Sequence, residues 1–317
     1  VDMRRERLGE RHYDTAEARG LLGTALAQSG RDDAALTEYR AAIPILLQVS
    51  RQNEDEGGLV DRDKRLQLIL EGYIDLLSRL KTAPADLNPA AEAFRVADAA
   101  RARGVQRALA ASAARASVGD PDLANLVRQE QDAQKQIAAQ FGLLSNLMSG
   151  PADQQDPVAT RKLRENIDKL RDARAALRGE IERRFPEYVS LIDPRPSTVA
   201  QVQESPRPRE ALISTYVGTR KTYVWAVPKS GPAGFSSAEL GDKQIAQMVA
   251  SLRKALEPNA NTLGDIPAFD LRLANQLYVR LLEPVRAGLQ NADSYLIVPH
   301  KALGQMPFGL LLTKPAR

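Results

Sequence analysis

The sequence contains no cysteine, which excludes disulfide bonds and thiolate metal sites from this chain. Histidine is almost as scarce, because only His12 and His300 are present, so we do not expect a zinc site built from imidazoles. Aromatic residues make up only 5% of the chain. The lack of cysteine does not decide the compartment, because reducing cytoplasm and cysteine-poor periplasm both tolerate it.

Long apolar runs and charge clusters are also missing. No apolar run approaches the ~20 residues that a bilayer-spanning helix needs, so we expect no membrane span. The 44 basic and 40 acidic residues alternate along most of the chain. Nucleic-acid binding would require a clustered basic face with interleaved aromatics, so we expect no nucleic-acid partner. A phosphate-binding glycine loop is absent too, and we expect no cofactor.

The abundant alanine, leucine and arginine favour a mostly helical chain. Residues 16–49 carry small and large residues at the spacing of a tetratricopeptide repeat. Gly23 and Ala35 are small where the two helices of such a pair cross closely. Three larger residues are expected to fill the space around that crossing: Leu22, Leu26 and Tyr39.

Further helix signals follow the first pair. Asp32 is a candidate N-cap for the second helix, and Pro44 should kink or shorten that helix. Apolar residues at helical spacing predict a helix over residues 64–80. Pro89 is well placed to start the next helix, an alanine-rich stretch over residues 90–116.

A long helical hairpin is predicted next. Apolar residues recur every three or four positions over residues 121–148 and again over residues 157–181. Asp120 and Asp156 each precede a proline, which is the pattern of a cap followed by the first helical position. Three polar residues on the apolar stripe either pair across the hairpin or mark a stripe that is not fully buried: Glu130, Gln134 and Arg174.

The hydrophobic pattern changes after a proline cluster, which places a domain boundary at about residue 207. Residues 211–217 and 222–227 are β-branched and aromatic, and they predict a β-hairpin. Trp225 alternates with Tyr223 on one face of the second strand, and we interpret both as core residues.

The remaining C-terminal elements alternate between helix and strand. Residues 231–241 are predicted to be irregular, and residues 242–256 form an amphipathic helix. A second helix is predicted over residues 270–289, capped by Asp270 and bent by Pro284. Residues 295–298 (YLIV) predict a short buried strand. Interleaved strands and helices favour an α/β layer arrangement.

That strand runs into Pro299–Leu310 (PHKALGQMPFGL), and the whole order resembles the opening of a CHAT domain. This family is a caspase-like protease module preceded by tetratricopeptide repeats. The resemblance implies a cysteine endopeptidase of the caspase and separase clan, whose repeats bind a partner or position a substrate. In that family the catalytic His and Cys lie further along the chain, so we expect them beyond residue 317.

The predicted fold is therefore α plus α/β. Residues 1–118 form the tetratricopeptide-type region, residues 119–206 form the hairpin and proline-rich linker, and residues 207–317 form the incomplete CHAT part. This chain has no cysteine and should be inactive alone, and we assign no catalytic, cofactor or metal residue to it. His300 is interpreted as an exposed turn residue.

Two partner surfaces are predicted. A groove in the repeats would bind a protein or peptide. An exposed sheet edge would pair with the rest of the CHAT domain or with another chain, so isolated residues 207–317 should aggregate or pair. Candidates for the polar groove lining, or for ordinary surface, are Gln28, Arg31, Arg40, Arg51 and Asn53.

Three hypotheses about the parent protein stay open. In the first, the chain is the N-terminal part of an active protease. In the second, the parent is a pseudo-protease whose caspase-like domain is a scaffold. In the third, the chain acts alone as a helical adaptor that mediates protein–protein interaction. The reading frame after Arg317 separates them.

Overall fold

The structure is a computed structural model, and it describes residues 1–10, 12–50, 59–101, 120–149, 156–192, 196–256 and 267–315. The chain forms two compact units. The first contains residues 1–45, 65–101 and 196–317, and the second contains residues 46–64 and 102–195. The three-part division by sequence stays a prediction. The described part is mostly helical with one small mixed sheet, as an α plus α/β fold requires.

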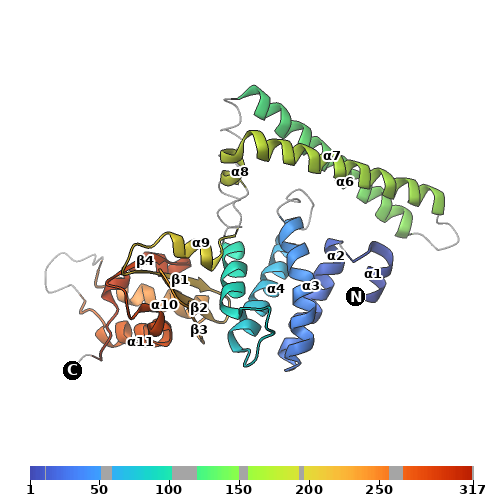
Figure 1. The fold of residues 1–317 in the computed structure, drawn as a ribbon. Coiled ribbons are helices and arrows are strands. Elements are labelled where there is room, and N and C mark those ends of the chain that lie inside the picture. Colours follow the sequence, from blue (N-terminus) through green and yellow to red (C-terminus); the bar gives the residue numbers. More distant parts are fainter. Residues whose placement is uncertain are drawn as a thin grey trace. The chain divides into compact units, whose positions relative to one another are not determined.

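The N-terminal helices are α1 (Asp2–Leu8), α2 (Tyr13–Gln28), α3 (Asp32–Ser50) and α4 (Leu59–Arg79), followed by helical residues 89–101 (Figure 1). The close approach predicted at Gly23 is confirmed, because a Cβ there would lie 3.1 Å from the ring of Tyr39. Tyr39 and Ala35 are fully buried. The prediction for Leu22 is wrong, since its side chain is 39% exposed.

Two expectations about α3 can be compared with the structure. Pro44 lies inside the helix, which continues to Ser50, so the helix is not shortened and the kink stays a prediction. Ile43 and Leu46 beside the proline are fully buried, and this packing offsets the cost of the missing backbone hydrogen bond. Asp32, predicted as the N-cap, is instead the first residue of the helix. Its Oδ2 accepts a hydrogen bond from Arg79 Nη1 at 2.6 Å.

The predicted helical hairpin is confirmed within the second unit. Helices α6 (Pro121–Ser149) and α7 (Pro157–Arg184) pack against each other, and α8 (Pro186–Ile192) follows. Asp156 accepts hydrogen bonds from the backbone N–H groups of Val158 and Ala159, and Asp120 caps α6 in the same way. Ile137, Leu144 and Ile167 form an apolar cluster between α6 and α7.

The first unit holds a four-stranded sheet with the order β3-β2-β1-β4. The strands are β1 (Glu210–Val217), β2 (Thr222–Pro228), β3 (Gly234–Ala238) and β4 (Ser294–Val298). The predicted hairpin is confirmed, because β1 and β2 are antiparallel with Ser214 opposite Trp225. β4 runs parallel to β1, with Ile297 beside Ile213. The irregular structure predicted for residues 231–241 is wrong, because β3 pairs antiparallel with β2 there.

Helices cover both faces of the sheet. On one face, α10 (Asp242–Arg253) and α11 (Leu271–Leu281) share an apolar core with the strands (Figure 1). The predicted helix through residue 289 ends at Leu281 and continues as the 3-10 helix η4 (Glu283–Leu289), because Pro284 cannot extend the α-helix. On the other face, Trp225 lies edge-to-face on Phe94 with ring centroids 5.8 Å apart.

The buried strand predicted at residues 295–298 is present but lies at an open edge. Tyr295 is 49% exposed, Leu296 40% and Val298 39%. β4 has only β1 as a neighbour in the sheet of described strands. The apolar composition of residues 295–298 predicts a buried strand, but a strand at the end of a sheet keeps one side uncovered.

Candidate functional site

Polar side chains meet where the parallel strands β1 and β4 end. His300 follows β4, and its Nδ1 accepts a hydrogen bond from the backbone N–H of Val217 at 2.9 Å. Its own backbone N–H donates to Thr215 Oγ1 at 3.0 Å. Its ring stacks on the ring of Tyr216, with the two ring centroids 4.9 Å apart. In open α/β sheets, ligands bind outside the carboxyl ends of strands, so we take this corner as the candidate site.

His300 is half-buried, which corrects the expectation of an exposed turn residue. Burial, together with the cations of Lys301 and Arg101, lowers its pKa to about 4, while Asp242 acts in the opposite direction. Nδ1 accepts a hydrogen bond only while it carries no proton. The imidazole is therefore neutral near pH 7 and carries its one ring proton on Nε2.

Arg101 reaches the same corner from helical residues 89–101. Its Nη1 donates to Ser214 Oγ at 2.9 Å, and its Nη2 donates to Asp98 Oδ1 at 3.1 Å. Asp98 Oδ2 in turn accepts the backbone N–H of Ser197 at 2.8 Å. Burial lowers the pKa of the guanidinium, and its Nε is buried without a hydrogen-bond partner among the described residues. The group ties the end of β1 to the helix.

Helix α4 holds the turn between β1 and β2. Glu71 Oε2 accepts the backbone N–H of Thr219 at 3.0 Å. Lys221 Nζ lies 2.8 Å from Asp75 Oδ1 and 2.8 Å from Glu239 Oε1. These contacts, and the hydrogen bond from Trp225 Nε1 to the carbonyl of Ala90 at 3.0 Å, fix the helices to the sheet. The expected core role of Trp225 and Tyr223 is confirmed, since both are buried.

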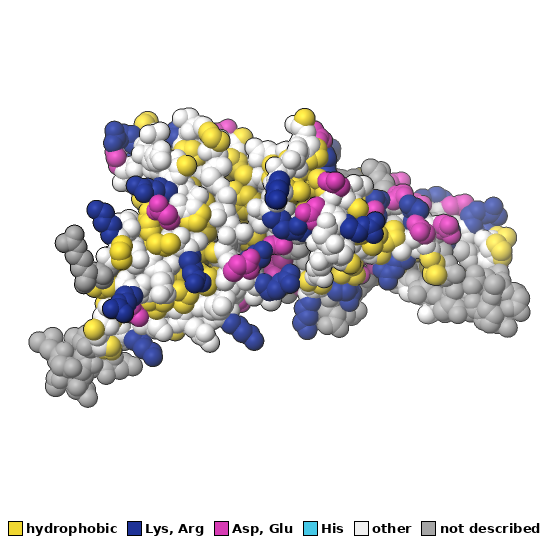
Figure 2. All heavy atoms as spheres, turned by 90° about the horizontal axis from the view of Figure 1, so that it is seen from below, with side chains coloured by type: hydrophobic (Ala, Val, Ile, Leu, Met, Phe, Trp, Pro, Cys, Tyr) yellow, Lys and Arg dark blue, Asp and Glu magenta, His cyan; other side chains and the backbone are white. Residues whose placement is uncertain are grey.

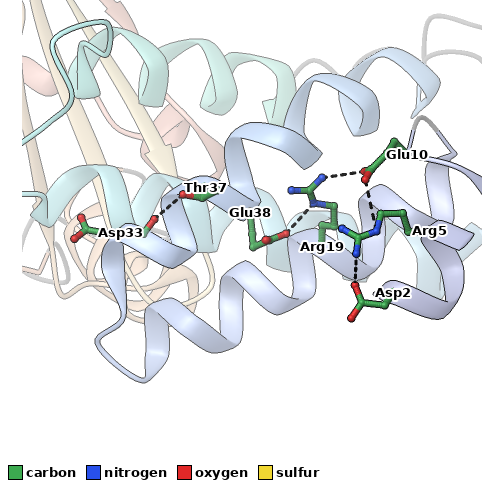
Figure 3. Close-up of polar contacts among 7 residues, drawn as sticks. All are labelled: Asp2, Arg5, Glu10, Arg19, Asp33, Thr37 and Glu38. Carbon is green, nitrogen blue, oxygen red and sulfur yellow. Dashed lines mark hydrogen bonds and ion pairs between the residues drawn. The ribbon is translucent and has the colours of Figure 1, made fainter.

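The α1–α3 surface carries an ion-pair chain rather than a recognisable binding site. Figure 3 shows Arg19 between Glu10 and Glu38, with Arg5 joining Glu10 to Asp2. Among the proposed lining residues, Gln28 and Arg31 are exposed and Arg40 pairs with Asp86, while Arg51 and Asn53 lie outside the described residues. On the face drawn in Figure 2, basic and acidic side chains are interspersed.

The described residues contain neither a metal-binding cluster nor a membrane-spanning helix. No group of three or more histidine, cysteine, aspartate or glutamate side chains comes together there in a way that could hold a metal ion. None of the described helices combines the length and apolar character needed to cross a bilayer.

Arg101 is the site residue that the sequence analysis missed. It lies seven positions after Phe94, and Ala97 lies between them, so all three share one face of the helix. Phe94 and Ala97 are buried. An arginine on the same helix face as buried apolar residues is expected to face the neighbouring layer of the fold and to find a polar partner there.

Comparisons with protein-family models, with curated proteins and with solved structures find no match to this chain.

Proposed function

We propose that this chain is part of a repeat-regulated caspase-like cysteine endopeptidase. In this proposal, α1 to α4 and helical residues 89–101 belong to a tetratricopeptide-type region that binds a protein partner or substrate. The sheet with α10 and α11 is the first part of the CHAT domain. The catalytic His and Cys lie beyond residue 317, since the chain has no cysteine of its own.

The observation that carries the proposal is the open edge of β4 beside the candidate site. β4 is parallel to β1, helices cover both faces of the sheet, and three apolar side chains of β4 stay exposed. A parallel strand is normally buried within an α/β sheet, with neighbours on both sides. A further strand beside β4 would bring its carboxyl end next to His300 and Thr215, where an active site belongs.

The decisive experiment uses the protein expressed from the complete reading frame that contains this chain. We expect cleavage of peptide substrates that disappears when a single cysteine in the added sequence is changed to alanine, together with labelling of that cysteine by a thiol-reactive probe. Residues 1–317 alone serve as the inactive control. A reading frame without cysteine, or cleavage that survives the alanine change, rules the proposal out.

A second candidate is a non-catalytic scaffold that mediates protein–protein interaction. The lack of cysteine favours it, because this chain itself supplies no thiol nucleophile. The same expression experiment separates the two functions. A scaffold would bind its partner equally well after every cysteine of the complete protein is replaced.

A further inference from the structure

The backbone of β4 presents hydrogen-bonding groups to its open side. The carbonyl of Val298 lies 3.5 Å from Thr215 Oγ1 of β1, and the N–H of His300 donates to the same oxygen. The N–H of Ser294 donates to the carbonyl of Arg209, the residue just before β1. The peptide groups of alternate residues in a strand face opposite sides. The N–H and C=O groups of Tyr295 and Ile297 therefore face away from β1, where the described strands provide no neighbour.

Nothing in the strand protects this edge. Natural proteins guard open edges with lysine, proline or a bulge. The five residues of β4, Ser-Tyr-Leu-Ile-Val, carry no charge and no proline, and they pair regularly with β1. Pro299 comes just after the strand, and it ends the row of donors because it has no N–H. The usable edge is thus two outward-facing residues with two donors and two acceptors.

That edge is complementary to itself. In an antiparallel pair with a two-fold axis at Leu296, Tyr295 of one copy faces Ile297 of the other. Residues that exchange both hydrogen bonds stand directly opposite in such a pair, so all the outward groups of both strands are satisfied. Aromatic and β-branched residues in this arrangement form a favourable cross-strand pair. No like charges face each other, because Asp293 falls opposite Pro299.

We propose that a second copy of this chain docks on β4 through this antiparallel register and joins the two sheets edge to edge. Leu296 then packs against its symmetry mate, which covers side chains that are now 40% exposed. In this register a neutral five-residue strand satisfies its outward hydrogen-bonding groups with an identical strand. The inference does not rest on the proposed peptidase, although a further strand from longer polypeptide would compete for the same edge.

The interface should be weak. A pair of five-residue strands buries less than the ~1,200 Å² of a standard interface, so association should be reversible. Sedimentation velocity from about 5 µM to about 500 µM should show a monomer that converts to a dimer and to nothing larger. A two-fold contact between two β4 edges uses the same edge of both copies, so assembly ends at the dimer. Species larger than the dimer would overturn the register.

The lack of cysteine makes cross-linking a direct test of the axis. In the proposed register, the two Leu296 residues form a non-hydrogen-bonded pair with Cα atoms ~4.5 Å apart, inside the ~4.4–6.8 Å range of disulfides. We expect Leu296→Cys to form an interchain disulfide under mild oxidation about tenfold faster than Val279→Cys, whose site on α11 is 49% exposed.

Two further variants keep the proposal falsifiable. Ile297→Cys should cross-link no faster than Val279→Cys, because its symmetry mate lies two residues away along the strand, and faster cross-linking there overturns the register. Leu296→Lys should abolish the dimer by placing two charges face to face, while Val279→Lys should leave it intact. Circular dichroism checks that each variant is folded. A protein that stays monomeric throughout the concentration range refutes the proposal.

Discussion

His300 shows how a single side chain takes its properties from its surroundings. Its ring lies on Tyr216, its Nδ1 accepts a backbone hydrogen bond from β1, and its own N–H binds Thr215. These contacts hold the turn after β4 against the end of β1. They require the neutral imidazole, so the charge state of one residue is linked to the stability of the sheet corner.

The linkage predicts a loss of stability in mild acid. The pKa of His300 falls from 6.5 in the unfolded chain to about 4 in the folded protein. Between these values the unfolded chain binds a proton that the folded protein excludes. The stabilisation is therefore complete above about pH 6.5 and is lost as the pH falls toward 4. Allowing for partial solvent screening, we expect a contribution of about 1–2 kcal/mol.

Urea unfolding at several pH values measures this contribution. His300→Gln has no titrating ring, so its stability should change less than that of the parent protein between pH 6.5 and pH 4. Other carboxyl groups titrate in both proteins and cancel in the difference. Parallel pH profiles for the two proteins would show that His300 is not protonated on unfolding in this range.

Arg101 yields a second prediction at the residue scale. Arg101→Met removes the hydrogen bonds to Ser214 and Asp98 and leaves Asp98 with a half-buried charge. We expect a loss of about 2 kcal/mol in the free energy of unfolding, because a charged group that loses its partner keeps its desolvation cost. Urea unfolding measures it. Arg40→Met is the matched control, since that arginine is an exposed partner of Asp86 and its loss should leave stability unchanged.

At the scale of elements, the α6–α7 hairpin contains a polar group inside an apolar seam. Arg174 is buried, its Nε donates to Glu130 Oε1 at 2.7 Å, and its Nη2 donates to Gln134 Oε1 at 2.6 Å. Of the two alternatives left open by the sequence, pairing across the hairpin is the one observed. Because this pairing is buried within the apolar seam, it can set the register of the two helices.

Removing Arg174 alone should lower the free energy of unfolding more than replacing Arg174, Glu130 and Gln134 together. Arg174→Leu alone leaves the Glu130 carboxylate without its partner, and we expect a loss of about 2–3 kcal/mol in the free energy of unfolding. The triple variant with leucine at Arg174, Glu130 and Gln134 should regain most of that loss, because well-packed apolar groups replace buried ion pairs at little cost. Chemical denaturation compares the two variants. Equal destabilisation of both would contradict this account of the seam.

The elements themselves were predicted to different degrees. Helix starts with a clear cap, such as Asp156 and Asp270, appear where the sequence places them, because a cap is a local interaction. β3 (GFSSA) was missed because it lacks β-branched residues. Its pairing with β2 and the stacking of Phe235 on Trp225 at 4.9 Å come from tertiary contacts. The exposure of β4 was missed for the same reason, since composition does not reveal the end of a sheet.

The candidate site was predicted less well than the elements. The sequence placed His300 after a strand, but its distance in sequence from Thr215 and Val217 concealed their contact. Arg101 lies more than a hundred residues before Ser214, and a single sequence gives no sign that two such residues meet. Only the position of Arg101 on a buried helix stripe hinted at a role. Sites built from distant segments depend on topology, which short-range patterns do not encode.

At the scale of the whole molecule, the helices and the sheet of the first unit depend on each other. Trp225, the only tryptophan of the chain, is fully buried between Phe94 and Phe235. Its Nε1–H donates to the carbonyl of Ala90. The sheet face that bears this residue is thus covered by helices that precede it in the chain by more than a hundred residues.

This dependence sharpens the expectation for isolated residues 207–317. Without the helices, that fragment exposes Trp225 and Tyr223 in addition to the edge of β4, and we expect it to aggregate at concentrations where the whole chain stays dispersed. Size-exclusion chromatography and tryptophan emission measure this. The whole chain should show the blue-shifted emission of a buried indole. A dispersed fragment with the same emission would show that the sheet does not need the helices.

The open edge of β4 is the claim on which both the proposed function and the dimer depend, and amide hydrogen exchange at low protein concentration tests it most directly. We predict an alternating pattern in which Leu296 and Val298, bonded to β1, exchange slowly, while Tyr295 and Ile297 exchange at nearly the rate of an unfolded peptide. Strong protection of Tyr295 and Ile297 in the dilute monomer would contradict the account, because another segment would then already occupy that edge.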